Sequence, residues 1–165
     1  MVLIVFLCGG CAYSLVRYDG GLGDVRSVTI DTPENDSYEP GVEYIVADAL
    51  RREFLRRRAV RLVEDSSQAD LVLTGRVLRI EASGRSFSSV VLALEYEVTL
   101  SLDLQARRTD GSEVPIDPRA LRESERYLAS ADAEALRKNR EEALRRLATL
   151  LAGRVYDALY ESLVP

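Results

Sequence analysis

Residues 95–106, EYEVTLSLDLQA, alternate apolar and polar side chains without a break, and this pattern gives the strongest structural prediction in the chain. The apolar positions are Tyr96, Val98, Leu100, Leu102, Leu104 and Ala106, and polar residues fill every position between them. A period of two places these sets on opposite faces of an extended strand. One buried face and one wet face are typical of an antiparallel sheet.

The residues that follow this strand predict a hairpin. Residues 109–112, TDGS, contain the Asp-Gly pair of a tight turn. We expect residues 119–129 to form the return strand because the hairpin needs one, although Glu123 and Glu125 interrupt its apolar face.

The residues upstream of residue 95 predict further strands and a helix. Residues 24–31 alternate as a strand would, and residues 71–82 are rich in β-formers, with Gly75 as a candidate bulge. Between them, residues 42–58 carry apolar side chains at helical spacing, with acidic residues near the start and arginines near the end.

A second helix is predicted at the C-terminal end of the chain. Ser130 or Asp132 can cap it, and its apolar stripe runs to about Leu163. The predicted fold class is therefore α+β, with two helices packed on one face of a mostly antiparallel, mixed four-stranded sheet in the order β-α-β-β-β-α.

The chain begins with a short export-like segment. Residues 1–10, MVLIVFLCGG, are too few to span a bilayer but match the apolar part of a lipoprotein signal peptide, and Cys11 follows as the predicted lipidation site. The alternatives are a buried structural pair of Cys8 and Cys11, or a redox or metal pair. We expect residues 11–23 to be a lipidated tether and residues 24–165 to be a single domain.

Composition excludes several functions. The 165 residues contain no His, and 27 acidic against 22 basic residues give a net charge of −5. His-based catalysis and His metal sites are therefore excluded, and a nucleic-acid footprint is not expected. No nucleophile or phosphate-loop motif occurs, so we predict a protein that is not an enzyme and has neither cofactor nor metal.

An arginine cluster is the strongest charge feature. It comprises Arg51, Arg52, Arg56, Arg57, Arg58 and Arg61. Its simplest interpretation is a solvated helix end. The alternative is contact with an anionic partner such as a phosphorylated glycolipid, because guanidinium groups pair bidentately with phosphate.

Several segments, taken together, resemble the lipopolysaccharide (LPS)-assembly lipoprotein family LptE. They are CAYSL at 11–15, VTI at 28–30, YEPG at 38–41, ALRREF at 49–54, ADLVLTGRV at 69–77, EY at 95–96 and NREEAL at 139–144. They occur in the family's order across nearly the whole chain, with Ala12 where the family usually has Gly.

The resemblance implies a lipid-anchored, periplasm-facing protein of the outer membrane. It would plug the large β-barrel LptD in a one-to-one complex, assist its assembly and help insert LPS into the outer leaflet. By position, Lys138 and Arg85 become the candidate LPS contacts. The competing class is a periplasmic regulatory or secretion lipoprotein that activates a cell-wall synthase or a pore.

Overall fold

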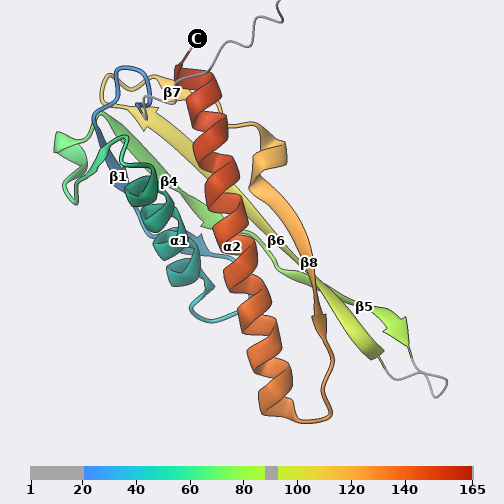
Figure 1. Ribbon diagram of the computed structural model, residues 1–165. Helices are drawn as coiled ribbons and strands as arrows, with labels where there is room; N and C mark the ends of the chain where they lie inside the picture. Colours follow the sequence, from blue (N-terminus) through green and yellow to red (C-terminus); the bar gives the residue numbers. More distant parts are fainter. Residues whose placement is uncertain (1–20, 88–92, 165) are drawn as a thin grey trace, which may run out of the picture.

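The computed structural model describes residues 21–87 and 93–164, and it places two helices on one face of a sheet (Figure 1). The helices are α1 (Val42–Arg57) and α2 (Ala133–Leu163). The strands are β1 (Ser27–Ile30), β2 (Glu34–Asn35), β3 (Arg61–Leu62), β4 (Leu71–Val77), β5 (Glu81–Phe87), β6 (Ala93–Arg108), β7 (Glu113–Val114) and β8 (Arg122–Leu128). The predicted α+β class is confirmed, while residues 1–20, including Cys8 and Cys11, lie outside the described residues.

Strand β6 organises the sheet because its two halves have different neighbours. The C-terminal half pairs antiparallel with β4 and β7, and the N-terminal half pairs antiparallel with β5 and β8. On the far side of β4 the pairing is parallel, in the order β3-β1-β4, with β2 also alongside β4. The prediction of four strands in the order β-α-β-β-β-α was therefore wrong. Eight strands are described, in the element order β-β-α-β-β-β-β-β-β-α, and the sheet path runs β3-β1-β4-β6-β5.

The predicted strand at 71–82 is divided into β4 and β5, which follow each other along the same strand β6. Val77 lies opposite Leu102 and Glu81 lies opposite Thr99, so residues 78–80 face only two residues of β6. This extra residue interrupts the ladder, as a bulge does. Gly75 is not the irregularity, because the β4–β6 register passes through it without a shift.

Strand β8 confirms the predicted return of the hairpin and explains its acidic pattern. Glu123 and Glu125 lie opposite Leu100 and Val98 of β6, whose side chains are buried in the core that α2 completes. Both carboxylates form salt bridges with α2: Glu123 pairs with Arg154, and Glu125 pairs with Arg146. The strand is thus joined to the helix by charge where an apolar pattern would be expected.

Three strands of two residues each, β2, β3 and β7, have no sequence pattern of their own. They exist because longer neighbours offer free backbone groups to pair with. The segment before α1, residues 32–41, is rich in turn-forming residues and contains β2. Its Asn35 is held by a hydrogen bond that it donates to Glu43 Oε2 at 2.7 Å and one that its Oδ1 accepts from Ser37 N at 2.9 Å.

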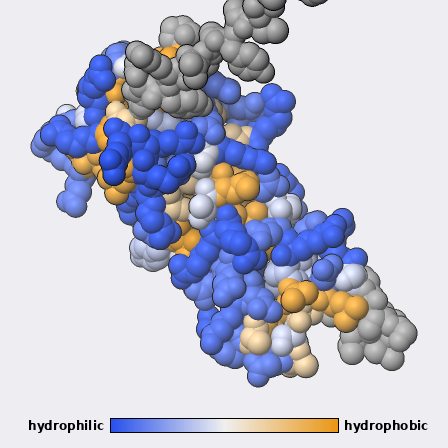
Figure 2. Space-filling view, in the orientation of Figure 1, coloured by the Kyte–Doolittle hydropathy of each residue, from blue (hydrophilic) through white to orange (hydrophobic). Residues whose placement is uncertain are grey.

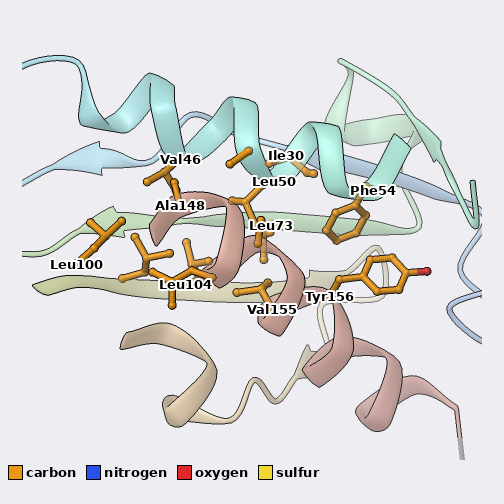
Figure 3. Close-up of a cluster of buried hydrophobic side chains, with 14 of the residues drawn as sticks. Ile30, Val46, Leu50, Phe54, Leu73, Leu100, Leu104, Ala148, Val155 and Tyr156 are labelled. Carbon is orange, nitrogen blue, oxygen red and sulfur yellow. The ribbon is translucent and has the colours of Figure 1, made fainter. Parts of the chain in front are cut away.

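The core lies between the helices and the sheet, and Figure 3 shows its centre. Side chains from α1 (Leu50, Phe54) meet side chains from β6 (Leu100) and α2 (Val155, Tyr156). The predicted buried face of residues 95–106 and the apolar stripe of the last helix are both confirmed in this cluster. At 31 residues, α2 is about 46 Å long, and it extends well past α1 toward the free ends of β5 and β8 (Figure 1).

The start of α2 agrees with the prediction. Asp132 is the N-cap, and its carboxylate accepts a hydrogen bond from Ala135 N at 2.7 Å. Such a cap satisfies one of the unpaired N–H groups of the first turn.

Candidate functional site

Lys138 lies on the exposed surface of α2, in the second turn of the helix. Its side chain is 64% exposed, and its Nζ stands 4.0 Å from Glu134 Oε1. Glu134 is already held by Arg137 at 2.7 Å, which leaves the ammonium weakly paired. The cation is therefore accessible to an anionic ligand, as its predicted role requires.

Arg85 lies on β5, near the same end of the molecule as Lys138 but on the other face of the sheet. Its Nε is 3.5 Å from Glu97 Oε2. Glu97 belongs to the polar set of β6, which points away from the helices, since its neighbours Tyr96 and Val98 pack against the core. The structure thus gathers the two predicted LPS contacts at one end without bringing them onto one face.

The sheet face that Arg85 shares is polar and internally neutralised. Arg122 of β8 reaches Glu81 of β5 at 3.0 Å, which spans the central strand between them. Beneath this pair, Thr99 and Ser101 are only 8% exposed despite belonging to the predicted wet face. Salt bridges across three strands therefore cover small hydroxyl side chains, and no apolar layer is needed on this side.

The arginine cluster predicted near the end of α1 is mostly paired within the protein. Arg56 and Arg57 both donate to Glu53, at 2.6 and 2.8 Å. Their hydrogen bonds, that from Arg56 foremost, hold the pKa of the Glu53 carboxyl below its usual value. Arg52 pairs with Asp48 at 2.8 Å. These contacts support the interpretation as a helix end more than an anion site.

A groove that sequence patterns did not reveal opens beside the first turns of α2. Its volume is about 700 Å³. It is lined by Tyr38, Glu39, Arg79, Ile80, Ala82, Tyr96, Tyr127, Ala133, Leu136, Arg137 and Arg140. The loop before α1, which runs toward α2 in Figure 1, supplies one wall, and the irregular residues 78–80 supply another. We refer to it below as the α2 groove.

Aromatic rings form part of the α2 groove. Tyr96 of β6 and Tyr127 of β8 stack with centroids 5.5 Å apart, and the Arg79 guanidinium lies 5.4 Å from the centre of the Tyr38 ring. Burial raises the pKa of the Tyr127 hydroxyl, and the neighbouring Arg140 acts in the opposite direction. Tyr38 itself is 86% exposed, so its ring and the arginine above it are open to solvent.

The cations of the groove are unequally paired. Arg140 is bound to Glu39 at 2.6 Å, yet its buried Nε has no hydrogen-bond partner. Arg137 pairs with Glu134 and Glu141. Among residues 21–87 and 93–164, Arg79 has no carboxylate partner. The lining thus carries three guanidinium groups against the single carboxylate of Glu39.

Apolar side chains are also exposed at this end of the molecule. Leu94 is 52% exposed and Leu128 is 64% exposed, both next to the free end of the three-stranded half of the sheet. Figure 2 shows apolar surface at this end, within a surface that is otherwise largely hydrophilic. No described helix is long and apolar enough to cross a membrane.

The fold is that of small bacterial lipoproteins. The chain is similar to the rare lipoprotein B of Shewanella oneidensis, with 18% identity over 79% of this chain and 95% of that one and a TM-score of 0.53. It is also similar to lipoprotein B of Nitrosomonas europaea, with 14% identity, 87% of both chains and a TM-score of 0.55. A putative lipoprotein of Caulobacter crescentus gives 18% identity, 80% and 90% coverage and a TM-score of 0.52. No curated protein sequence matches.

The family model described as LptE, lipopolysaccharide-assembly, matches residues 25–159. The chain belongs to this family, so it is an LPS-assembly lipoprotein, and the family is not one of enzymes. The resemblance noted from short segments is confirmed, and the competing class of regulatory or secretion lipoproteins is not supported.

Proposed function

We propose that this chain is an outer-membrane lipoprotein that plugs the LPS-assembly barrel LptD, assists its assembly and helps insert LPS into the outer leaflet. The observation that carries the proposal is the match to the LptE family over residues 25–159. In this role Cys11 would bear the lipid, and the described domain would face the periplasm and the barrel lumen.

The polar sheet face supports the plug role. The lumen of a large outer-membrane barrel is polar, so a protein that fills it needs a hydrophilic surface on which no charge is left unpaired when it is covered. The face formed by β5, β6 and β8 meets this requirement, because its charges already pair with one another, Glu81 with Arg122 and Glu97 with Arg85 and Arg126.

Purification from outer membranes tests the barrel role. A tagged full-length chain should bring down one large β-barrel protein in equal amount, and Cys11→Ser should release the chain from the membrane fraction. If the parent chain is isolated from native membranes without a barrel, the plug role is wrong. If the mature native protein carries an unmodified Cys11, the anchor is wrong.

Lys138 and Arg85 are the proposed LPS contacts. We expect Lys138→Asp combined with Arg85→Asp to weaken LPS binding several-fold, since a charge-assisted hydrogen bond contributes about 1.5–3 kcal/mol. Because a plug is held by surface complementarity around its circumference, the double variant should still co-purify with the barrel. Arg107→Asp combined with Arg119→Asp is the matched control, because both are exposed cations away from the end of the molecule that holds Lys138 and Arg85. Unchanged LPS affinity in the first variant would show that the site lies elsewhere.

A further inference from the structure

We propose that the outer edge of β8 pairs with an unassembled strand of the barrel protein and serves as its template while the barrel is built. The inference rests on the proposed function and names the surface through which assembly is assisted. Strand β8 forms one edge of the three-stranded half of the sheet (Figure 1). Within the described ranges, 21–87 and 93–164, it pairs with β6 on one side and with no strand on the other.

Among the described edges of the sheet, β8 is the longest with a regular backbone. Its seven residues all pair with β6 in one register, from Arg122 opposite Ser101 to Leu128 opposite Glu95. Strand β5, at the opposite edge, has register shifts on either side of Ser86, and β3 has only two residues. Bulges and short strands hinder the addition of a further strand, whereas a regular edge permits it.

The backbone of every second residue of β8 faces away from β6. Ala129 N donates to Leu94 O at 3.0 Å, which marks these two residues as a hydrogen-bonded pair. Such pairs alternate with non-hydrogen-bonded pairs in an antiparallel ladder, so Ser124, Arg126 and Leu128 belong to the second kind. The Ser124 hydroxyl lies 2.7 Å from that of its β6 partner, which fits the close side-chain spacing of such a pair. The N–H and C=O groups of these three residues therefore point to the outer edge.

Side chains of the protein itself occupy part of this edge. Asn139 of α2 donates to Leu128 O at 3.0 Å, and Ser124 N donates to the Glu123 carboxylate at 3.0 Å. Among the described residues, no side chain accepts from the N–H of Arg126, which lies between them. A backbone group of an added strand can replace each of these side chains, so the arrangement suits a partner that pairs and then leaves. A strand of an unfinished barrel is such a partner, because its own edge is open only until the barrel closes.

A hollow beside the end of β8 leaves space for the added strand. Its volume is about 250 Å³, and it lies between Arg126 and Leu128 of β8 and Asn139, Glu142 and Arg146 of α2. Leu128 is 64% exposed, and the side chain of Glu142 is 70% exposed. The added strand would therefore contact the N-terminal half of α2 as well as the backbone of β8.

The side chains of β8 determine which strands fit this edge. Arg126 Nε lies 3.9 Å from Glu97 Oε2, a long distance for an ion pair, and the arginine side chain is 61% exposed. A carboxylate opposite Arg126 and an apolar side chain opposite Leu128 would complete the cross-strand pairs on this face. A uniformly apolar strand would cover the arginine without pairing it, which is unfavourable. The edge thus favours a strand that has a polar face, as barrel strands do.

Proline at position 126 tests the backbone contact. Arg126→Pro removes an N–H that points away from β6, so it leaves the ladder with β6 intact and blocks strand addition. In cells that carry this variant, we expect newly made barrel to reach its folded, SDS-resistant form about fivefold more slowly, as loss of one hydrogen bond predicts. Arg126→Val is the matched control. It loses the charge but keeps the N–H, and its rate should stay within about twofold of the parent, because exposed ion pairs contribute little.

Disulfide crosslinking tests the pairing without proline, and it decides the question if urea unfolding shows that Arg126→Pro is not folded. Ser124→Cys and Arg126→Cys should crosslink to cysteines in one barrel strand, at barrel positions two residues apart, because paired strands keep a constant register. The crosslinks should form with pulse-labelled barrel and fade as the barrel folds. Leu150→Cys, at an exposed position on α2, is the control and should not show this spacing.

The inference is wrong if a folded Arg126→Pro variant assembles the barrel at the parent rate, or if the two cysteines give no crosslinks with a common register. It is also wrong if they link two copies of this chain instead, or if the crosslinks persist unchanged in the finished complex. A parent that co-purifies with the barrel, with edge variants that behave as the parent does, overturns only the role of the edge. A parent that does not co-purify with a barrel overturns the proposed function as well.

Discussion

At the scale of single residues, Gly75 shows how closely two strands approach. Its φ is +153°, and a Cβ at this position would lie 2.0 Å from the Asp103 carbonyl oxygen and 2.9 Å from the Leu104 Cα. Both atoms belong to the backbone of β6, so neither can rotate aside. Gly75 therefore allows the backbones of β4 and β6 to approach closely at this point. The irregularity expected at Gly75 lies instead at residues 78–80.

We expect Gly75→Ala to destabilise the fold by roughly 2 kcal/mol or more, since overpacking against fixed backbone costs about 1–3 kcal/mol and an unfavourable φ adds to it. Urea unfolding followed by circular dichroism measures the change. Gly111→Ala is the control, because Gly111 has a φ of +85° but open space around it, and should cost only about 1 kcal/mol. Equal losses in the two variants would show that close approach does not matter at Gly75.

At the scale of elements, β8 and α2 are coupled by charge. Arg146 pairs with Glu125 and Arg154 pairs with Glu123, in both cases between partly exposed side chains. The alternating acidic residues that weakened the strand prediction are thus the residues that bind the helix. Strand β8 supplies the carboxylates and helix α2 supplies the guanidinium groups, so the salt bridges form only when the two elements pack together.

Exchange of the charges tests this coupling. Glu125→Arg should place like charges together and destabilise the fold by about 0.5–1 kcal/mol, the range for partly exposed pairs. Adding Arg146→Glu should restore most of the loss, as measured by urea unfolding at low salt, and a salt concentration on the order of 1 M should reduce both effects. A double variant less stable than Glu125→Arg alone would contradict the pairing.

At the scale of the whole molecule, carboxylates that join distant segments set the response to acid. Arg108 donates to Asp24 and holds the pKa of that carboxyl below its usual value. The backbone N–H groups of Arg26 and Ser27, with the Ser27 hydroxyl, do the same for the pKa of Asp70. Such contacts tie the residues at and just before the start of β1 to the segment that precedes β4 and to the last residue of β6.

A lowered pKa in the folded state gives stability that is present above the unfolded pKa of about 4 and is lost as pH falls through the folded value. We therefore expect the urea midpoint to fall between about pH 5 and pH 3 and to change little between about pH 5 and pH 8. Asp70→Asn keeps the shape but removes one ionisation, so its midpoint should fall less over the same interval. A parent midpoint in acid equal to that at neutral pH would contradict the linkage.

The sequence by itself determined the elements whose pattern is local. The alternation in residues 95–106, the helical stripe of α2 and the cap at Asp132 each need only neighbouring residues, and all three are confirmed. The order of short segments along the chain was also enough to indicate the LptE family. These features could be predicted because their periodicity or spacing is visible in the amino-acid sequence alone, without knowledge of which distant segments come into contact.

Only the tertiary structure decided the features that depend on distant partners. The division of residues 71–82 at 78–80 follows from the register along β6, and the strands of two residues follow from free backbone groups on their neighbours. The α2 groove joins Tyr38, Arg79 and Arg140 from three separate parts of the chain. Because none of these residues belongs to a local pattern that groups them, their proximity becomes visible only when folding brings them to one surface.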